Sequence, residues 1–409
     1  MALAFSGASR ALSKERVLVV AIAVFLISVP AATSAAVRLH APIELTSPNA
    51  QNDSTFGTSV AIDGRVMVVG APYEGAGGQS QAGAAYIIRS GVTYTLASPS
   101  PQLLGQFGDS VAAAGGQVVV GAPNENSSML KGAGDVYIFG EKSGSIVRTL
   151  TSPNVQQEGA FGGSVAIGSG IIVVGAPLED AGGYHQAGRV YVFGAQTGSL
   201  LYTLESPNTQ DEGGFGSSVA VSGTVLVVGA PGEDVGVDGG AGNAYTFVAT
   251  SGTPSCTLTS PNPGPGGAFG LSVAAWKGVV VVGEPGADLS GYLSVGDAYT
   301  FSSSTCLLAH TLLSTNEQET GLFGISVAAG SGVVVVGAEG ENVANQGYSG
   351  RAYVFGASSG TLRQTLTSPN AQAQGNFGSS VAADSYGILV GAAGETFAGL
   401  LGAGHAYEY

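Results

Sequence analysis

Carboxylates at a fixed spacing are the first candidates for chemistry in this sequence. A glutamate stands four residues after the glycine of a recurring Gly-Ala-Pro or related triplet in six copies, and Ala287 takes its place in a seventh. Paired carboxylates could hydrolyse a glycosidic bond or attract a cation or a basic ligand. An active site should be singular, so we interpret the glutamates mainly as acceptors of backbone N–H groups in their own loops. The six are Glu74, Glu125, Glu179, Glu233, Glu341 and Glu395, and the next position adds Asp180, Asp234 and Asp288.

Histidine and cysteine offer little support for catalysis or for a metal site. His40, His185, His310 and His405 belong to no Ser/His/Asp, Cys/His or metal-spaced motif. The two cysteines, Cys256 and Cys306, form no CxxC pair, which argues against a zinc or redox centre. They could form a disulfide in an oxidising compartment or remain as two buried thiols, and both alternatives stay open. We therefore expect a protein without catalytic residues, metal or cofactor.

Aromatic residues that differ between copies are stronger candidates for ligand contacts. Aromatic side chains beside carboxylates can stack on sugar rings or anchor a protein interface. Scattered surface tyrosines are also ordinary, so this remains a hypothesis about binding. Trp276, in a turn at the opposite end of the strands, could be a lone exposed contact. The predicted ligand-binding set is Tyr73, Tyr184, His185, Tyr292 and Tyr348, with Glu179, Asp180, Glu233 and Asp234 as polar partners.

These candidates belong to a repeat that occurs seven times. Each copy has a Phe-Gly pair, a glycine fourteen residues after the Phe, and a tyrosine sixteen residues further on. A leucine stands eleven residues before each Phe. The first step between copies is 51 residues long and the next five are 54, which a self-similar architecture explains. The pairs begin at Phe56, Phe107, Phe161, Phe215, Phe269, Phe323 and Phe377.

Each copy predicts four short antiparallel strands, named A to D in chain order. Strand A follows the Phe-Gly pair, strand B is a valine-rich run, strand C contains the tyrosine, and strand D contains the leucine before Ser-Pro. Seven such units predict an all-β fold, a seven-bladed β-propeller of four-stranded antiparallel blades. The segment from Pro42 to Asn49 is a lone D strand, and the chain ends on a C strand at Gly404 to Tyr409. We therefore expect the N-terminal strand to complete blade 7 and close the ring.

These residues resemble the FG-GAP repeat family, the propeller repeat of integrin α subunits and of many secreted microbial proteins. The resemblance rests on Phe56-Gly57 and on Gly70-Ala71-Pro72, and on their counterparts in the other copies. Integrin-like repeats often carry an aspartate-rich calcium loop between these motifs. Only Asp63 and Asp384 place a carboxylate there, so we expect the calcium sites of the family to be absent.

Charge and the N-terminus suggest the compartment. The formal net charge is −15, which disfavours nucleic-acid and anionic-membrane partners. Residues 1–36 carry a basic start, an apolar run and small residues, as a cleaved secretory signal peptide does, which leaves 37–409 as the propeller without a membrane span. Asn52 and Asn126 begin N-x-Ser sequons for glycosylation.

We expect a secreted, non-catalytic binding or adhesion module. In a propeller the D–A and B–C loops share one face, here called the loop face, and a rigid scaffold usually carries function on such loops. The expected partner is an extracellular protein or carbohydrate. The alternatives are a structural or self-assembling cell-surface protein and an enzyme that acts on polysaccharide.

Overall fold

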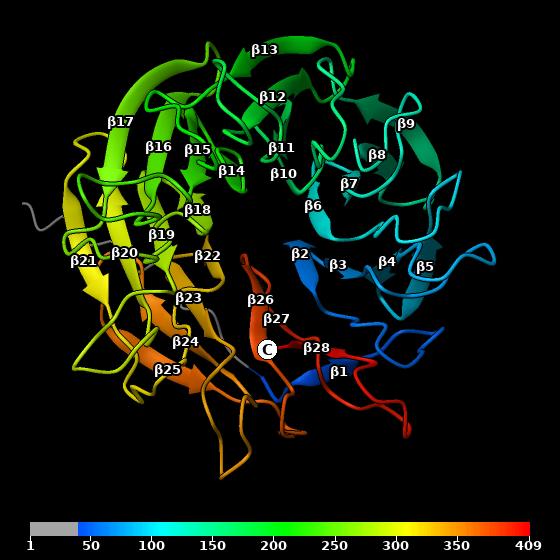
Figure 1. The fold of residues 1–409 in the computed structure, drawn as a ribbon. Helices are drawn as coiled ribbons and strands as arrows, with labels where there is room; N and C mark the ends of the chain where they lie inside the picture. Colours follow the sequence, from blue (N-terminus) through cyan, green and yellow to red (C-terminus); the bar gives the residue numbers. More distant parts are fainter. Residues whose placement is uncertain (1–39) are drawn as a thin grey trace, which may run out of the picture. The chain divides into compact units, whose positions relative to one another are not determined.

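The computed structural model describes residues 40–409, so the predicted signal peptide at 1–36 lies outside the described residues. Residues 40–409 form a ring of seven four-stranded antiparallel sheets, shown in Figure 1. Every regular element between residues 40 and 409 is a strand. The prediction of an all-β, seven-bladed propeller is therefore confirmed.

The strands follow one another radially in each blade, with strand A nearest the centre (Figure 1). Blades 1 to 3 contain β2 (Ser59–Asp63), β3 (Val66–Ala71), β4 (Ala84–Arg89) and β5 (Val92–Leu96); β6 (Ser110–Ala114), β7 (Gln117–Ala122), β8 (Asp135–Gly140) and β9 (Ile146–Thr151); and β10 (Ser164–Gly168), β11 (Ile171–Ala176), β12 (Arg189–Gly194) and β13 (Leu200–Leu204). Blades 4 to 6 contain β14 (Ser218–Ser222), β15 (Val225–Ala230), β16 (Asn243–Val248) and β17 (Thr253–Thr259); β18 (Ser272–Trp276), β19 (Val279–Glu284), β20 (Asp297–Ser302) and β21 (Leu308–Leu312); and β22 (Val327–Gly330), β23 (Val333–Ala338), β24 (Arg351–Gly356) and β25 (Leu362–Leu366).

Blade 7 is assembled from both ends of the repeat region. It contains β26 (Phe377–Ala383), β27 (Ile388–Ala392) and β28 (His405–Glu408), and its fourth strand is β1 (Ile43–Leu45). β1 pairs antiparallel with β28, with Leu45 opposite Ala406. The predicted ring closure is confirmed, although only three residues of the Pro42–Asn49 segment form the ladder, and the chain turns at Pro48-Asn49.

Hydrogen bonds from strand A join each blade to the next. The Ser59 hydroxyl donates to the carbonyl oxygen of Gly108 at 2.7 Å, and the Ser380 hydroxyl closes the circle onto Gly57 at 2.7 Å. A Cβ at Gly70, in strand β3, would overlap the same Gly108 carbonyl, which explains why this position of strand B must be glycine. The strand A serines, such as Ser59 and Ser380, therefore hold one blade against the next.

Apolar clusters fill the space between successive blades. Phe107, for example, is fully buried and packs with Val118 and Val120 of its own blade and Val68 of the preceding blade. Its ring also lies 5.6 Å from that of Tyr137. The fixed Phe and Tyr of each copy thus supply the large buried surface that holds the ring together.

The two cysteines form a disulfide in the structure. Cys256 lies on β17 of blade 4, and Cys306 lies in the C–D connection of blade 5, with their Cα atoms 5.8 Å apart. The sequence left a disulfide and two buried thiols equally open, and the structure has the disulfide. It links two neighbouring blades at the outer edge of the ring.

None of the elements between residues 40 and 409 is a helix long and apolar enough to cross a membrane.

Candidate functional site

The loop face is built from the B–C and D–A loops, because the antiparallel strand order brings these two connections to the same end of each blade. Each B–C loop contains a tight antiparallel bridge, such as Ala181 with Tyr184. The Asp180 carboxylate stabilises this loop by accepting a hydrogen bond from the Gln186 backbone N–H at 2.9 Å. Asp234 accepts the equivalent bond from Gly240 at 2.9 Å. Both aspartates are exposed, but one oxygen of each shapes its own loop.

A glutamine that the sequence analysis missed ties each D–A loop to the neighbouring B–C loop. The Gln156 side chain accepts from the Asp180 N–H at 2.8 Å and donates to the Asp180 carbonyl at 3.3 Å. The signal was present in the sequence, since a glutamine stands five residues before the Phe in six copies and Gly264 replaces it in blade 5. These residues are Gln51, Gln102, Gln156, Gln210, Gln318 and Gln372.

The repeated glutamates lie inside the ring and not on its surface. Glu179 and Glu233 are 0% exposed, so their assignment as ligand contacts is corrected. The Tyr191 hydroxyl donates to Glu179 at 2.5 Å, and the Ser152 hydroxyl, from the preceding blade, donates at 2.5 Å. The acceptor role that we expected exists, but the donors are side chains and not loop N–H groups. The Ser-Pro-Asn segment therefore connects each blade to the buried glutamate of the next.

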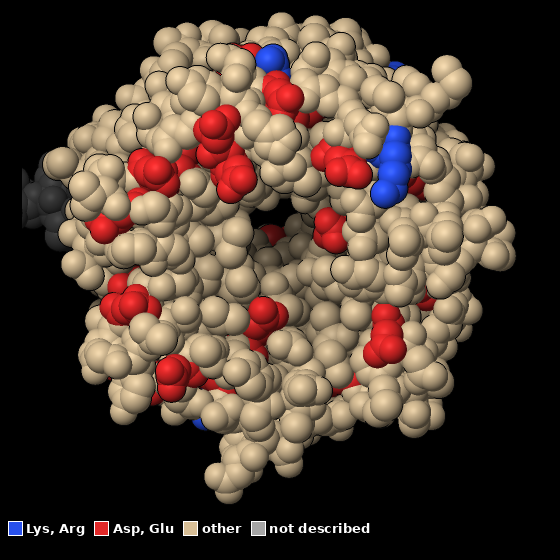
Figure 2. Space-filling model, viewed as in Figure 1, with Lys and Arg blue, Asp and Glu red and all other residues tan. Residues whose placement is uncertain are grey.

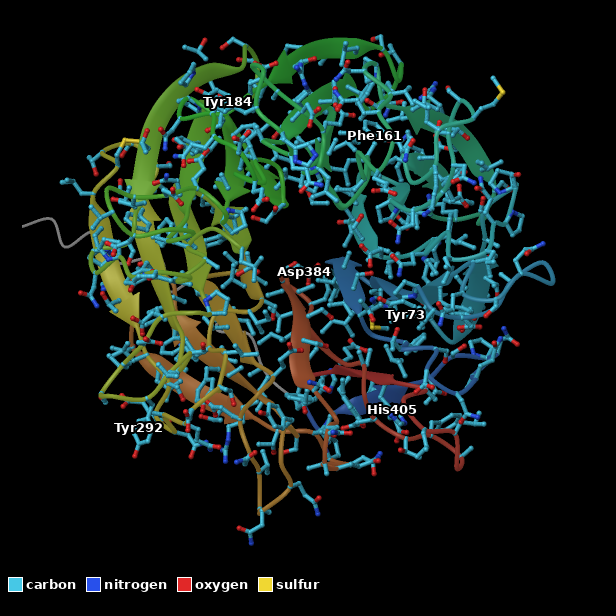
Figure 3. The ribbon with its side chains drawn as sticks, viewed as in Figure 1. Tyr73, Phe161, Tyr184, Tyr292, Asp384 and His405 are labelled. Atoms are coloured by element: carbon cyan, nitrogen blue, oxygen red, sulfur yellow. A yellow bond between two sulfur atoms is a disulfide. The ribbon has the colours of Figure 1, made fainter. Side chains whose placement is uncertain are left out.

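In blades 3, 6 and 7 the residue two positions before the tyrosine is basic and lies beside the buried glutamate. Arg351 lies 3.3 Å from Glu341, and Arg189 lies 4.0 Å from Glu179. In blade 7 the buried His405 lies between Glu395, at 3.1 Å, and the β1 residue Glu44, at 3.0 Å. Its position, labelled in Figure 3, is on the blade that both ends of the repeat region complete. These partners are structural, because each is directed at a carboxylate that solvent does not reach.

Blade 5 keeps the network by exchanging two positions. Ala287 stands where other blades have glutamate, whereas Glu284 stands where the other copies have alanine. Glu284 is fully buried and accepts from the Ser260 hydroxyl at 2.7 Å, so it replaces the missing carboxylate. Tyr299 donates instead to Asp297 at 3.0 Å. The two sequence departures of blade 5 thus compensate for each other.

Burial raises the pKa of these carboxyl groups. Desolvation raises the pKa of Glu284 to about 7, with a further contribution from the nearby Asp297 and an opposing one from the Ser260 and Tyr299 hydroxyls. Desolvation also raises the pKa of Glu74, Glu179 and Glu233 above the ordinary value, against the lowering effect of their tyrosine, serine and asparagine donors. A raised pKa means that these groups bind a proton more readily in the folded protein than in the unfolded chain.

We expect the ring to be less stable at pH 8 than at pH 5. Between about pH 4.5 and about pH 7, folded Glu284 retains a proton that the unfolded chain has lost, so the free energy of unfolding falls as the pH rises. The contribution of Glu284 is present below pH 4.5 and is lost above about pH 7, and it amounts to roughly 1–3 kcal/mol. Urea denaturation at both pH values measures it.

Replacement of the carboxyl group isolates this effect. Glu284→Gln should reduce the difference in free energy of unfolding between pH 5 and pH 8. The exposed Glu212→Gln is the control, because blade 7 already has Gln374 at the equivalent position. A pH dependence that is identical in wild type and Glu284→Gln would show that Glu284 does not titrate in this interval.

The predicted aromatic contacts are exposed but lie apart. Tyr73, Tyr184, Tyr292 and Tyr348 are 38–51% exposed, and His185 is exposed as well. Figure 3 shows Tyr73, Tyr184 and Tyr292 in separate sectors of the ring. The expectation that Tyr184, His185 and Tyr292 form one patch is therefore wrong, because the whole of blade 4 separates their loops.

Trp276 and the sequon asparagines have clear positions. Trp276 is half-buried against the core between blades 5 and 6, and the Lys277 ammonium lies 5.0 Å from its ring centre, so it is not the lone exposed contact that the sequence left open. Asn52 and Asn126 are exposed on the loop face. Each also accepts a backbone hydrogen bond, Asn52 from Leu401 at 3.0 Å and Asn126 from Gly132 at 3.1 Å.

An apolar cavity on blades 1 to 3 was not predicted. It has a volume of about 820 Å³, and its apolar lining is Leu103, Leu104, Leu178 and Pro101. The polar side chains of Gln79, Gln102, Asn124, Asn126, Lys131 and Glu158 also line it. The Lys131 ammonium and the Glu158 carboxylate lie 3.8 Å apart. Leu103 and Leu104 are 62% and 50% exposed, which is unusual for adjacent leucines in a loop. The signal was present as a departure from the repeat, because the other copies have polar or small residues there.

Comparison with known families agrees with this architecture. The model of the FG-GAP repeat matches four segments, at residues 43–88, 146–193, 204–247 and 361–409. FG-GAP repeats are thus present at these four positions in the chain. No curated protein matches the chain in a search of such sequences.

The FG-GAP repeats of this chain use their two A–B turn carboxylates for contacts between blades. Asp384, which Figure 3 places near the centre of the ring, accepts from the Gly64 N–H at 2.6 Å. Asp63 accepts from the Gly115 N–H at 3.1 Å. Within residues 40–409, no group of three or more histidine, cysteine, aspartate or glutamate side chains could hold a metal ion. Both carboxylates are thus explained by the structure of the turns.

Proposed function

We propose that this protein is a secreted, non-catalytic binding module whose loop face recognises an extracellular protein. FG-GAP β-propellers are generally non-catalytic, and the fold suggests a ligand-binding or adhesion-type module. The cavity lined by leucines on blades 1 to 3 is the observation from which we infer both the site and a protein as its partner. The Cys256–Cys306 disulfide supports export, because disulfides persist in oxidising compartments.

The leucines at this cavity replace polar residues at loop positions. Blade 1 has Asn52-Asp53 where blade 2 has Leu103-Leu104, and blade 3 has Gln157-Glu158. Leu104 also adopts a left-handed backbone with φ of 61°, a conformation that costs energy for a leucine. Neither exposure nor backbone preference favours leucine here, which supports a role in contacts with a partner.

A second strained apolar residue extends the same surface. Met129, in the B–C loop of blade 2, is 99% exposed and has φ of 69°. Four of the six other copies have glycine at this position. Leucine and methionine suit the apolar anchor of a protein partner.

The negative charge of the chain favours a protein partner with basic residues around its apolar anchor. The chain carries a net charge of −15, and Figure 2 shows acidic side chains spread around the viewed face. Glu158 at the cavity and Asp180 beside it are exposed. Complementary charge would speed association and help to exclude other partners.

The test uses an array of extracellular proteins and a glycan array, each probed with the full chain. The variant Leu103→Asn/Leu104→Asp introduces the two residues of blade 1, and Asp53 already tolerates the left-handed conformation with φ of 55°. We expect it to weaken binding to the protein partner at least tenfold without changing the melting temperature. Tyr184→Ala and Tyr292→Ala should bind nearly as well as wild type.

The other outcomes distinguish the alternatives. Binding that survives Leu103→Asn/Leu104→Asp but is lost with Tyr184→Ala would place the site on blade 3. Signals on the glycan array alone would favour a carbohydrate ligand, and concentration-dependent assembly without any ligand would favour a structural protein. A carbohydrate-hydrolysis screen with a positive result would overturn the non-catalytic assignment. A glycan at Asn126, which lines the same cavity, should block binding of the protein partner.

A further inference from the structure

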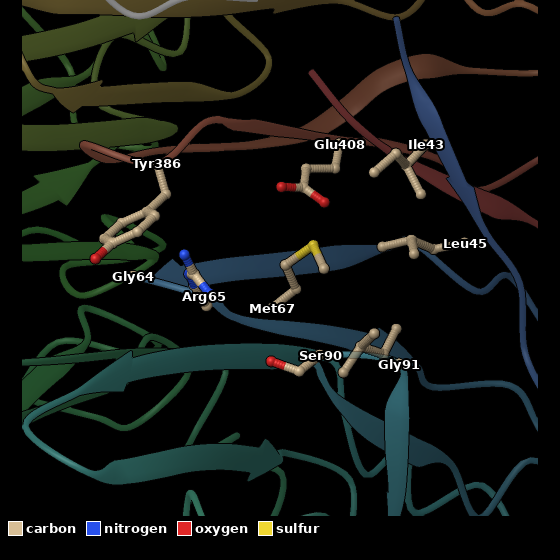
Figure 4. Close-up of a pocket in the computed structure, with 10 residues that line it drawn as sticks. Ile43, Leu45, Gly64, Arg65, Met67, Ser90, Gly91, Tyr386 and Glu408 are labelled. Atoms are coloured by element: carbon tan, nitrogen blue, oxygen red, sulfur yellow. The ribbon is translucent and has the colours of Figure 1, made fainter. Parts of the chain in front are cut away.

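A second cavity lies where blade 7 meets blade 1, at the end of the blades opposite the loop face. It has a volume of about 440 Å³ and lies between the A–B and C–D turns, as Figure 4 shows. Its floor is formed by Ile43 and Leu45 of β1 and by Met67 and Ile88 of blade 1. We call it the seam pocket, because it marks the place where the two ends of the repeat region are joined. It is separate from the proposed protein site.

The seam pocket exists because the C–D connection of blade 1 is shorter than its counterparts. At other junctions this connection contacts the D strand of the preceding blade. The Tyr202 hydroxyl, for example, donates to the Ala249 carbonyl, and a His310 ring nitrogen lies 3.2 Å from the Ser358 carbonyl. In blade 1 only Ser90-Gly91 separates β4 from β5, so the position two residues before Leu45 has no such loop against it. That position is Ile43, which is 50% exposed and lines the pocket.

A smaller side chain enlarges the same space. Ile88 stands two residues after the strand C tyrosine, where every other blade has an aromatic residue. In blade 2 that ring, Phe139, packs edge-on against Phe107 at 5.9 Å. The substitution removes an aromatic ring from the wall of the pocket. The equivalent residues are Phe139, Phe193, Phe247, Phe301, Phe355 and Tyr409.

Two large polar side chains stand at the rim where the repeat has small ones. Arg65 and Tyr386 occupy the third position of the A–B turn in blades 1 and 7, the two blades that border the seam. Both are exposed, and Figure 4 shows them on the same side of the pocket. Within residues 40–409, the Arg65 guanidinium forms no ion pair. The other blades have Gly116, Gly170, Thr224, Gly278 and Gly332.

A carboxylate completes the pocket from strand β28. Glu408 lines it and is half-buried, and the imidazole of the exposed His40 lies 3.9 Å from its carboxylate. A charged residue is unusual here, because the equivalent position in the other blades lies in the middle of strand C and is apolar or threonine. Those residues are Ile87, Ile138, Val192, Thr246, Thr300 and Val354.

We propose that the seam pocket binds a small zwitterion with an apolar body, the chemical class of free hydrophobic amino acids and short apolar peptides. Glu408 would receive the ammonium group, and Arg65 would hold the carboxylate through its planar fork of donors. The apolar body would rest on Ile43, Met67 and Ile88, with the Tyr386 ring at the mouth. The departures from the repeat converge on one cavity whose volume suits a small molecule.

The test is calorimetric titration of the full chain with L-phenylalanine and L-leucine. We expect saturable binding at one site with a micromolar to low-millimolar dissociation constant. Two chemical probes separate the charged contacts: N-acetyl-L-phenylalanine lacks the ammonium group, and L-phenylalaninamide lacks the carboxylate. Each should bind wild-type protein at least tenfold more weakly than L-phenylalanine.

The variants use residues that other blades already contain. Arg65→Gly should weaken L-phenylalanine at least tenfold and leave the affinity for L-phenylalaninamide unchanged, because the amide has no carboxylate to lose. Glu408→Thr should also weaken L-phenylalanine at least tenfold, and it should leave the affinity for N-acetyl-L-phenylalanine unchanged, because this probe has no ammonium group. Ile88→Phe should abolish binding by filling the pocket. Lys277→Gly removes a cation from an A–B turn of blade 5 and is the matched control with unchanged affinity.

Three results would overturn the proposal. The first is absence of binding by wild type at millimolar amino acid. The second is equal affinity for the two blocked probes and the free amino acid, which would show that the pocket does not bind the ammonium and carboxylate groups. The third is full binding by Ile88→Phe with an unchanged melting temperature, which would place the amino acid elsewhere. The probes act on wild-type protein, so the test does not depend on whether the variants fold.

Discussion

Deletion of Pro42–Asn49 is expected to abolish cooperative unfolding of the ring or to lower its melting temperature by more than about 5 °C, a shift that corresponds to several kcal/mol in a protein of this size. The reason is that this segment belongs to two blades. β1 forms the outer strand of blade 7, where Leu45 is buried. Beyond the strand, the buried Ser47 donates to Glu74 at 3.0 Å and lies 3.1 Å from the Tyr86 hydroxyl.

The deletion leaves unpaired groups on both sides of the seam. β28 loses the ladder that covers its outer edge, and an open edge strand is prone to pairing with other chains. On the blade 1 side, Glu74 loses the Ser47 hydroxyl and the Asn49 amide, which donates at 2.6 Å. An unsatisfied buried carboxylate costs about 1–3 kcal/mol for each missing charged hydrogen bond.

Addition of the missing segment in trans is the decisive control. A synthetic Pro42–Asn49 peptide should restore a cooperative melt in the truncated protein, since it supplies the same ladder and donors. The same peptide with Leu45→Asp should fail, because it would bury an unpaired charge. A truncated protein that melts like wild type without peptide would show that β1 does not hold the ring closed.

The repeat makes the fold predictable but conceals part of the chemistry. The Phe-Gly pairs, the valine-rich runs and the lone D strand at Pro42–Asn49 together predict seven blades and their closure, since periodicity and chain order alone decide these features. The burial of Glu179 could not be read in the same way. A glutamate beside an aspartate in a polar loop has the composition of a surface site, and its burial depends on Tyr191 and on Ser152 from a neighbouring blade.

Residues that differ from the equivalent residues of the other blades mark the unusual surfaces of the ring. Leu103-Leu104 and Arg65 are visible in the sequence as exceptions, yet their meaning depends on which exceptions meet in space. Tyr184 and Tyr292 are also exceptions, but they lie in separate sectors of the ring. The sequence therefore identifies the unusual residues, and the ring geometry decides which of them share a site.

The exchange of positions in blade 5 gives the second large effect. Glu284→Ala should lower the free energy of unfolding by about 1–3 kcal/mol, because the buried Ser260 hydroxyl loses its acceptor. Ala287→Glu should destabilise by at least as much, since it adds a carboxylate to a buried space that already holds Glu284 and Asp297. Each single variant thus changes the number of buried glutamates in blade 5, where the other blades have one glutamate at the position of Ala287.

The double variant Glu284→Ala/Ala287→Glu should restore stability to within about 1 kcal/mol of wild type, because it rebuilds the arrangement of blade 2, where Ala122 and Glu125 accompany Asp135. Urea denaturation of the four proteins at pH 7 gives the coupling energy, which should favour the double variant by about 2 kcal/mol or more. Additive losses would mean that Glu284 does not replace the glutamate of the other blades.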